Sequence, residues 1–101
     1  MLRFEIVFSE QANIDIQTLT DTIIYEYKAP LTAFRYVQGL LDEIKKLKWI
    51  AALLPIQQSP YFLQYGLTVR RLKYKKMTVI YTLSGDKVYI QRVVPSSTIT
   101  A

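Results

Sequence analysis

Residues 67–94 decide the fold and read LTVRRLKYKKMTVIYTLSGDKVYIQRVV. Valine, isoleucine, leucine and tyrosine dominate this stretch, and Ser84-Gly85-Asp86 has the composition of a tight turn. The pattern predicts three consecutive antiparallel strands, at residues 67–73, 77–83 and 87–94. Pro95 has no amide proton to donate to a sheet, so it should end the last strand.

Upstream of these strands, the sequence predicts one more strand and a first helix. Apolar residues recur at every second position from Leu2 to Phe8, which is the period of a half-buried strand. Ser9 has the right side chain to cap a helix that follows it. Apolar residues then recur at helical spacing as far as Tyr27, and this predicts a helix over residues 10–28.

A second helix should follow almost directly. Pro30 suits the opening turn of a helix, and apolar residues recur every three or four positions from Ala33 to Leu47. The short linker between two amphipathic helices predicts an antiparallel helical hairpin. Residues 49–54 could extend the second helix as far as Pro55, whereas residues 57–60 resemble a loop and residues 61–66 show no clear period.

The composition limits the kinds of chemistry that the chain can perform. It has 101 residues, half of them apolar, which predicts one globular domain over residues 1–101. The chain contains neither cysteine nor histidine, which excludes disulfides, Cys–His nucleophiles and nearly all zinc sites. We therefore expect no metal and no cofactor. No apolar run is long enough for a signal peptide or a membrane span, so we expect a cytoplasmic protein that does not contact a membrane.

The charges are distributed unevenly along the chain. Residues 67–101 contain seven basic residues and one acidic residue, whereas residues 1–66 contain six basic and seven acidic residues. The net charge of +5 therefore comes entirely from the last third. Such an asymmetry predicts a positive surface that attracts an acidic partner.

The order of these elements and the sequences of three strands resemble the RelE/ParE toxin superfamily. The resemblance rests on Val69-Arg70-Arg71-Leu72, on Val79-Ile80-Tyr81 and on Val88-Tyr89-Ile90-Gln91-Arg92-Val93, and it covers nearly the whole chain. It implies an α+β fold in which two antiparallel helices pack on one face of an antiparallel sheet. It also implies the toxin of a bacterial type II toxin–antitoxin pair, of the kind that stabilises plasmids, neutralised by a small antitoxin protein.

The resemblance leaves two branches open, and the residues favour one of them. The RelE branch cleaves mRNA at the ribosome, and it should place an arginine near the start of the Val-Ile-Tyr strand, where this chain has Thr78. It should also place a basic residue and then a tyrosine beyond the last strand, where this chain has Val94-Pro95-Ser96-Ser97 and no later tyrosine. The resemblance therefore favours a toxin that acts by binding a macromolecular target, either a member of the ParE branch, whose target is DNA gyrase, or a catalytically divergent relative.

The candidate binding residues lie on the first strand of the meander and on the turn that follows it. If Leu72 points to the core, strand alternation places Arg71 and Lys73 on the opposite face, while Arg70 shares the face of Leu72 and should pair with a helix carboxylate. An arginine fork suits phosphates and carboxylates alike, and a tyrosine beside cations can stack on a base. The predicted target-binding residues are Arg71, Lys73, Tyr74, Lys75 and Lys76.

Two alternatives remain open from the sequence. The chain could be a ribosome-dependent mRNA endoribonuclease with a relocated set of cations, namely Arg71, Lys73 and Arg92. It could also be a non-toxic binding module with the same fold. A homodimer is compatible with the sequence as well.

Overall fold

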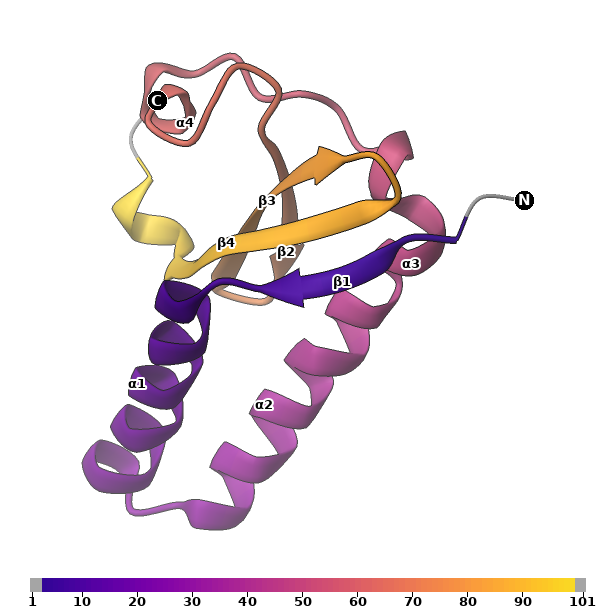
Figure 1. Ribbon diagram of the computed structural model, residues 1–101. Coiled ribbons are helices and arrows are strands. Elements are labelled where there is room, and N and C mark those ends of the chain that lie inside the picture. Colours follow the sequence, from indigo (N-terminus) through magenta and orange to yellow (C-terminus); the bar gives the residue numbers. More distant parts are fainter. Residues whose placement is uncertain (1–2, 100–101) are drawn as a thin grey trace.

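The computed structural model describes residues 3–99, and its four strands form one sheet in the order β1-β4-β3-β2. β2 (Arg70–Tyr74), β3 (Met77–Ser84) and β4 (Lys87–Pro95) form the predicted antiparallel meander. β1 (Glu5–Phe8) lies beside β4 and runs parallel to it (Figure 1). The sheet is therefore mixed rather than wholly antiparallel, because the helical hairpin between β1 and β2 returns the chain in its original direction.

The predicted helical hairpin is formed by α1 (Glu10–Tyr27) and α2 (Pro30–Lys45). The Oγ atom of Ser9 accepts a hydrogen bond from the Ala12 amide at 2.9 Å, which confirms Ser9 as the N-cap. The chain turns between the helices at Lys28, which adopts the left-handed conformation common at helix ends (φ 49°). Within residues 3–99, no helix is both long and apolar enough to cross a membrane.

The irregular segment after α2 contains three short helices. After α2 the chain forms α3 (Leu47–Ile50) and then the 3₁₀ helix η1 (Ala51–Leu53). Helical structure therefore ends just before Pro55, as predicted. The segment then forms α4 (Pro60–Leu63), which the sequence pattern did not reveal. β2 begins three residues later than predicted, because residues 67 and 68 still form a bend after Gly66, whose φ is 130°.

The main core lies between the helices and one face of the sheet. Ala12 of α1, Leu40 and Ile44 of α2, and Val79 and Ile90 of the sheet are all buried there. The far end of the hairpin extends past the sheet (Figure 1), which leaves several large side chains exposed. These exposed residues are Tyr25, Tyr27, Leu31 and Phe34. The apolar periodicity of α1 therefore extends to Tyr27 without burying it, because the sheet does not reach this end of the helix.

A second, smaller core covers the opposite face of the sheet, and we call it the second cluster. Its fully or nearly fully buried members are Phe62, Val69, Ile80 and Val94, with Tyr61, Tyr65 and Ile99 packed against them. Phe62 comes from α4, so this short helix lies across the face that the long helices leave uncovered. The second cluster therefore covers the sheet on the side toward which Arg71 points.

Candidate interaction site

Arg71 and Lys73 lie on the face of β2 opposite the main core, as strand alternation predicted. Leu72 is buried in the main core, whereas the guanidinium carbon of Arg71 lies 5.8 Å from the ring centre of Phe62 in the second cluster. Such a cation–π contact holds the guanidinium against its own chain. Lys73 is exposed, and its ammonium forms no ion pair within residues 3–99.

Tyr74 and Lys75 belong to a compact aromatic group that fixes the turn between β2 and β3 against α2. The rings of Tyr36 and Tyr74 meet edge to face at 5.4 Å between centroids. The ammonium of Lys75 lies 5.4 Å from the centre of each ring. The Tyr74 hydroxyl also fits closely against Gly39 of α2, which has no side chain to exclude it. Lys76 completes the turn and is exposed, so the lysines of this rigid turn face solvent.

Arg92 is engaged by a carboxylate that the sequence did not single out. Its Nε and one terminal nitrogen donate to the two oxygens of Asp15 on α1, at 2.7 and 2.9 Å. Asp15 Oδ2 also accepts a hydrogen bond from the Val93 amide at 2.9 Å. Burial alone would raise the pKa of Asp15, but these hydrogen bonds outweigh it and hold the pKa below its ordinary value. The pair joins α1 to β4 at the point where β1 has ended.

The environment of Arg70 differs from the prediction. Arg70 was expected to pair with a helix carboxylate, but no acidic side chain within residues 3–99 lies close enough to form an ion pair with it. Its Nε atom is buried without a hydrogen-bond partner. The prediction fails because Arg70 lies at the start of β2, beside Ile56, where the neighbouring segment carries no acid.

The position that would carry a catalytic arginine in the RelE branch lies inside the protein. Thr78 is fully buried, and its Oγ1 atom lies 2.7 Å from the Ser96 Oγ atom, at hydrogen-bond distance. Of the alternative catalytic set, Arg71 contacts Phe62 and Arg92 is paired with Asp15. Lys73 alone in that set forms neither an ion pair nor a cation–π contact with the described part of the chain.

A second candidate surface lies at the other edge of the sheet, along β1. The Glu5 amide donates to the Asp86 carbonyl, just before β4, at 2.8 Å, and the Ser9 amide donates to the Ile90 carbonyl of β4 at 3.0 Å. Because backbone groups alternate in direction along an extended strand, those of Ile6 and Phe8 point away from β4. β1 is an edge strand, so these groups face outward and can pair with an added strand.

An apolar groove runs beside this free edge. The side chains of Ile6 and Phe8 form one wall, and Leu41 and Ile44 of α2 form the other. The groove has a volume of about 330 Å³, and Gln38, Lys45 and Lys48 also line it. A free strand edge beside an apolar groove is a common arrangement for binding an extended peptide.

Comparison with known proteins finds a similar structure but no similar family or curated sequence. No protein-family model and no curated protein sequence matches the chain. A solved chain described as "Chromosomal ParDE TA system from P. aeruginosa" superimposes with a TM-score of 0.75 and 18% sequence identity. The match covers 92% of this chain and 96% of that chain. The chain therefore has the same fold as that ParDE chain. The fold class predicted from the three strand sequences is thereby confirmed.

The residues that line the β1 edge of this RelE/ParE-type fold were not predicted as a site. The cations Lys45 and Lys48 belong to residues 1–66, whose net charge is slightly negative. The charge distribution along the sequence therefore indicated a positive surface only after residue 66. Asp15 was likewise missed, because a single acid on a helix carries no signal of its distant partner. The alternation of apolar residues from Leu2 to Phe8 was the available clue to an edge strand, although it does not reveal which edges remain free.

Proposed function

We propose that this chain is the toxin of a type II toxin–antitoxin pair, which acts in the cytoplasm by binding its target rather than by cutting RNA. The observation that carries the proposal is the match of the whole fold to a chain from a ParDE toxin–antitoxin system. The buried Thr78 favours binding over cleavage, because a threonine enclosed in the protein cannot supply the cation that RNA cleavage requires.

The target-binding surface in this proposal is the turn between β2 and β3 with the adjoining part of β2. Lys73 and Lys76 are exposed, and Lys75 is presented by a turn that two tyrosine rings hold in place. A rigid cationic surface loses little conformational entropy when it binds. We propose DNA gyrase as the target, with Tyr74 and Arg71 supporting this surface.

The antitoxin in this proposal occupies the free edge of β1 and the adjacent groove. An extended antitoxin segment would hydrogen-bond to the outward backbone groups of Ile6 and Phe8 and place apolar side chains between β1 and α2. Covering this edge would also remove a site at which chains could aggregate.

The test compares gyrase inhibition with RNA cleavage by the purified protein. We expect inhibition of gyrase-catalysed supercoiling, and no cleavage of an mRNA held on ribosomes. The double variant Lys73→Gln/Lys76→Gln should weaken the inhibition at least tenfold. A matched double variant that also removes two exposed cations, Lys28→Asn/Arg35→Gln, should leave it unchanged. Ribosome-dependent cleavage that Arg71→Ala abolishes would overturn the proposal in favour of the nuclease.

A further inference from the structure

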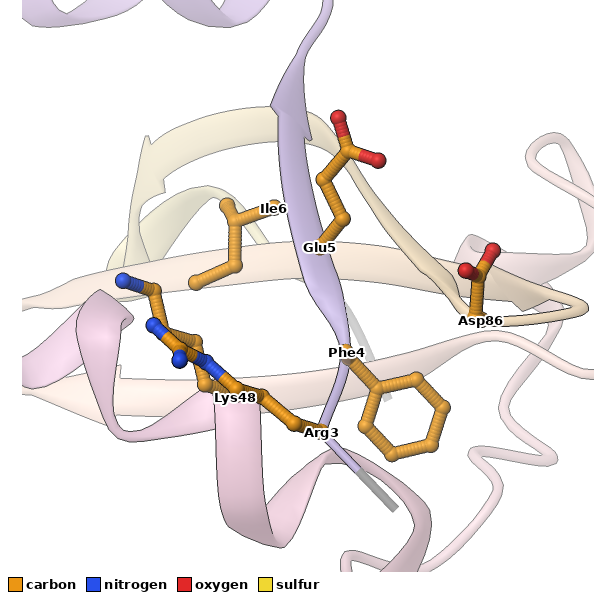
Figure 2. A pocket seen from close by; sticks show the side chains of 6 residues that line it. All are labelled: Arg3, Phe4, Glu5, Ile6, Lys48 and Asp86. Carbon is orange, nitrogen blue, oxygen red and sulfur yellow. The ribbon is translucent and has the colours of Figure 1, made fainter.

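Two cations line one pocket at the beginning of β1. It has a volume of about 410 Å³ and is lined by Arg3, Phe4, Glu5, Ile6, Lys48 and Asp86. Figure 2 shows the side chains of Arg3 and Lys48 on one side of β1, and those of Glu5 and Asp86 on the other side. The hydrogen bond from the Phe4 amide to the Lys48 carbonyl, at 2.9 Å, fixes β1 to α3 at this point.

Neither of these two cations is neutralised by the described part of the chain. Within residues 3–99, no carboxylate lies within ion-pair distance of Arg3 or Lys48. Both acids of the pocket are already engaged with Lys87, at 2.8 Å from Glu5 and 3.8 Å from Asp86. Two positive charges that line one pocket repel each other, and an anion bound in that pocket relieves the repulsion.

Arg3 is oriented by an aromatic ring. Its guanidinium carbon lies 5.6 Å from the centre of the Trp49 ring, and Trp49 is half exposed at 52%. A guanidinium that stacks on a ring keeps its hydrogen-bond donors free at its rim, where they can bind a carboxylate in a two-pronged geometry. Trp49 is also the single tryptophan of the chain, so its fluorescence reports on this site.

The pocket adjoins the apolar groove beside the free edge of β1. The two cavities share Ile6 and Lys48 in their linings. A ligand that fills both must offer backbone groups for the strand edge, apolar side chains for the groove and an anion for the two cations. A peptide segment has all three, whereas a nucleic acid has no backbone amides and no aliphatic side chains. The combination therefore favours an acidic peptide over a polyphosphate.

We propose that Arg3 and Lys48 form a carboxylate-binding subsite for an extended acidic and apolar segment of the antitoxin. The inference rests on the proposed function for the identity of that partner, but the chemistry of the subsite stands on the geometry alone. One aspartate or glutamate of the segment would lie between the two cations, while neighbouring leucine-like side chains enter the groove beside Ile6 and Phe8.

The test uses two blocked hexapeptides, one alternating leucine with glutamate and the other alternating leucine with glutamine. Binding is followed by Trp49 fluorescence and by the amide chemical shifts of Ile6 and Phe8 in the isotope-labelled protein. We expect the glutamate peptide to bind at least tenfold more tightly than the glutamine peptide at low salt. The double variant Arg3→Gln/Lys48→Gln should abolish that preference, and the equally charged variant Lys28→Asn/Arg35→Gln should retain it.

Equal affinity for the two peptides would overturn the inference, as would an unchanged preference in the Arg3→Gln/Lys48→Gln variant. A larger fluorescence change with a short oligothymidylate than with the glutamate peptide would also contradict it. Failure here is distinguishable from failure of the proposed function. A chain that binds the glutamate peptide but does not inhibit gyrase retains its subsite, whereas a gyrase inhibitor without the peptide preference disproves this inference alone.

Discussion

At the scale of single residues, Gly39 shows how a missing side chain can position a functional loop. Glycine in the middle of a helix is normally unfavourable, and alanine would be preferred by about 1 kcal/mol. In α2, however, a Cβ atom at position 39 would overlap with the Tyr74 hydroxyl. The glycine therefore lets Tyr74 fit against α2, and this contact holds the turn that presents Lys75 and Lys76.

We expect Gly39→Ala to destabilise the protein by about 1–3 kcal/mol, the usual cost of overpacking a close contact. In a Tyr74→Ala background, the same substitution should instead stabilise by up to about 1 kcal/mol, because only the helix preference remains. Urea unfolding of the four proteins in this double-mutant cycle measures both effects. A Gly39→Ala substitution that stabilises the wild-type background would show that the close contact with Tyr74 does not constrain α2.

The carboxylate of Asp15 accepts hydrogen bonds from a part of β4 that has no paired residue on β1. It accepts hydrogen bonds from Arg92 and from the Val93 amide at the part of β4 that β1 does not cover. Asp15→Asn should cost about 2–3 kcal/mol, because it leaves a half-buried guanidinium without its counter-charge. Glu26→Gln, which removes an exposed acid from the same helix, should change the stability by less than about 0.5 kcal/mol.

The same pair predicts a pH dependence of stability. The folded state lowers the pKa of Asp15 below its ordinary value of 3.8, so the ionised carboxylate contributes stability that is present above that value and is lost as the pH falls below it. The difference in unfolding free energy between wild type and Asp15→Asn should therefore shrink when the pH is lowered from 6 toward 3. A difference that stays constant over this range would show that the charge of Asp15 does not stabilise the fold.

At the scale of elements, α4 is held by tertiary contacts and not by its own sequence. Four residues are too few for a stable isolated helix. Phe62 is buried at 1% exposure in the second cluster, whereas its neighbour Leu63 is 53% exposed. Phe62→Ala should cost about 3–4 kcal/mol, close to the lower end of the total stability of a small domain.

Leu63→Ala serves as the matched control, and we expect a change within about 0.5 kcal/mol. Phe62→Leu keeps most of the buried volume and should cost less than half as much as Phe62→Ala, which preserves a measurement if the alanine variant does not fold. Urea unfolding again gives the values. Equal costs at positions 62 and 63 would contradict the burial that places α4 over the sheet.

The sequence predicted those elements whose apolar periodicity and turn residues lie within one continuous stretch of the chain. The meander and both long helices follow from apolar periodicity and turn residues within a single stretch, so their positions agree with the structure to within three residues. α4 escaped prediction because its single buried residue, Phe62, gives no period. Two other features depend on contacts between residues more than seventy positions apart. These are the parallel pairing of β1 with β4 and the ion pair between Asp15 and Arg92.

At the scale of the whole molecule, the two edges of the sheet differ in character. The β2 edge continues into a lysine-rich turn, while the β1 edge adjoins an apolar groove with Arg3, Lys45 and Lys48 nearby. The sequence indicated the first surface through its excess of basic residues after position 66. It could not indicate the second, because Arg3 and Lys48 line one pocket only when β1 pairs with β4 and α3 packs against β1. A toxin that binds a target at one edge and an antitoxin at the other would use both.

The most direct test of the proposed function is to induce the chain from a tightly controlled promoter in a bacterium and to label DNA and protein synthesis separately. We predict that growth stops and that DNA synthesis fails before protein synthesis, as expected of a gyrase-directed toxin that acts by binding. A collapse of translation before any loss of DNA synthesis would contradict this, as would undisturbed growth while the soluble protein accumulates to a high level.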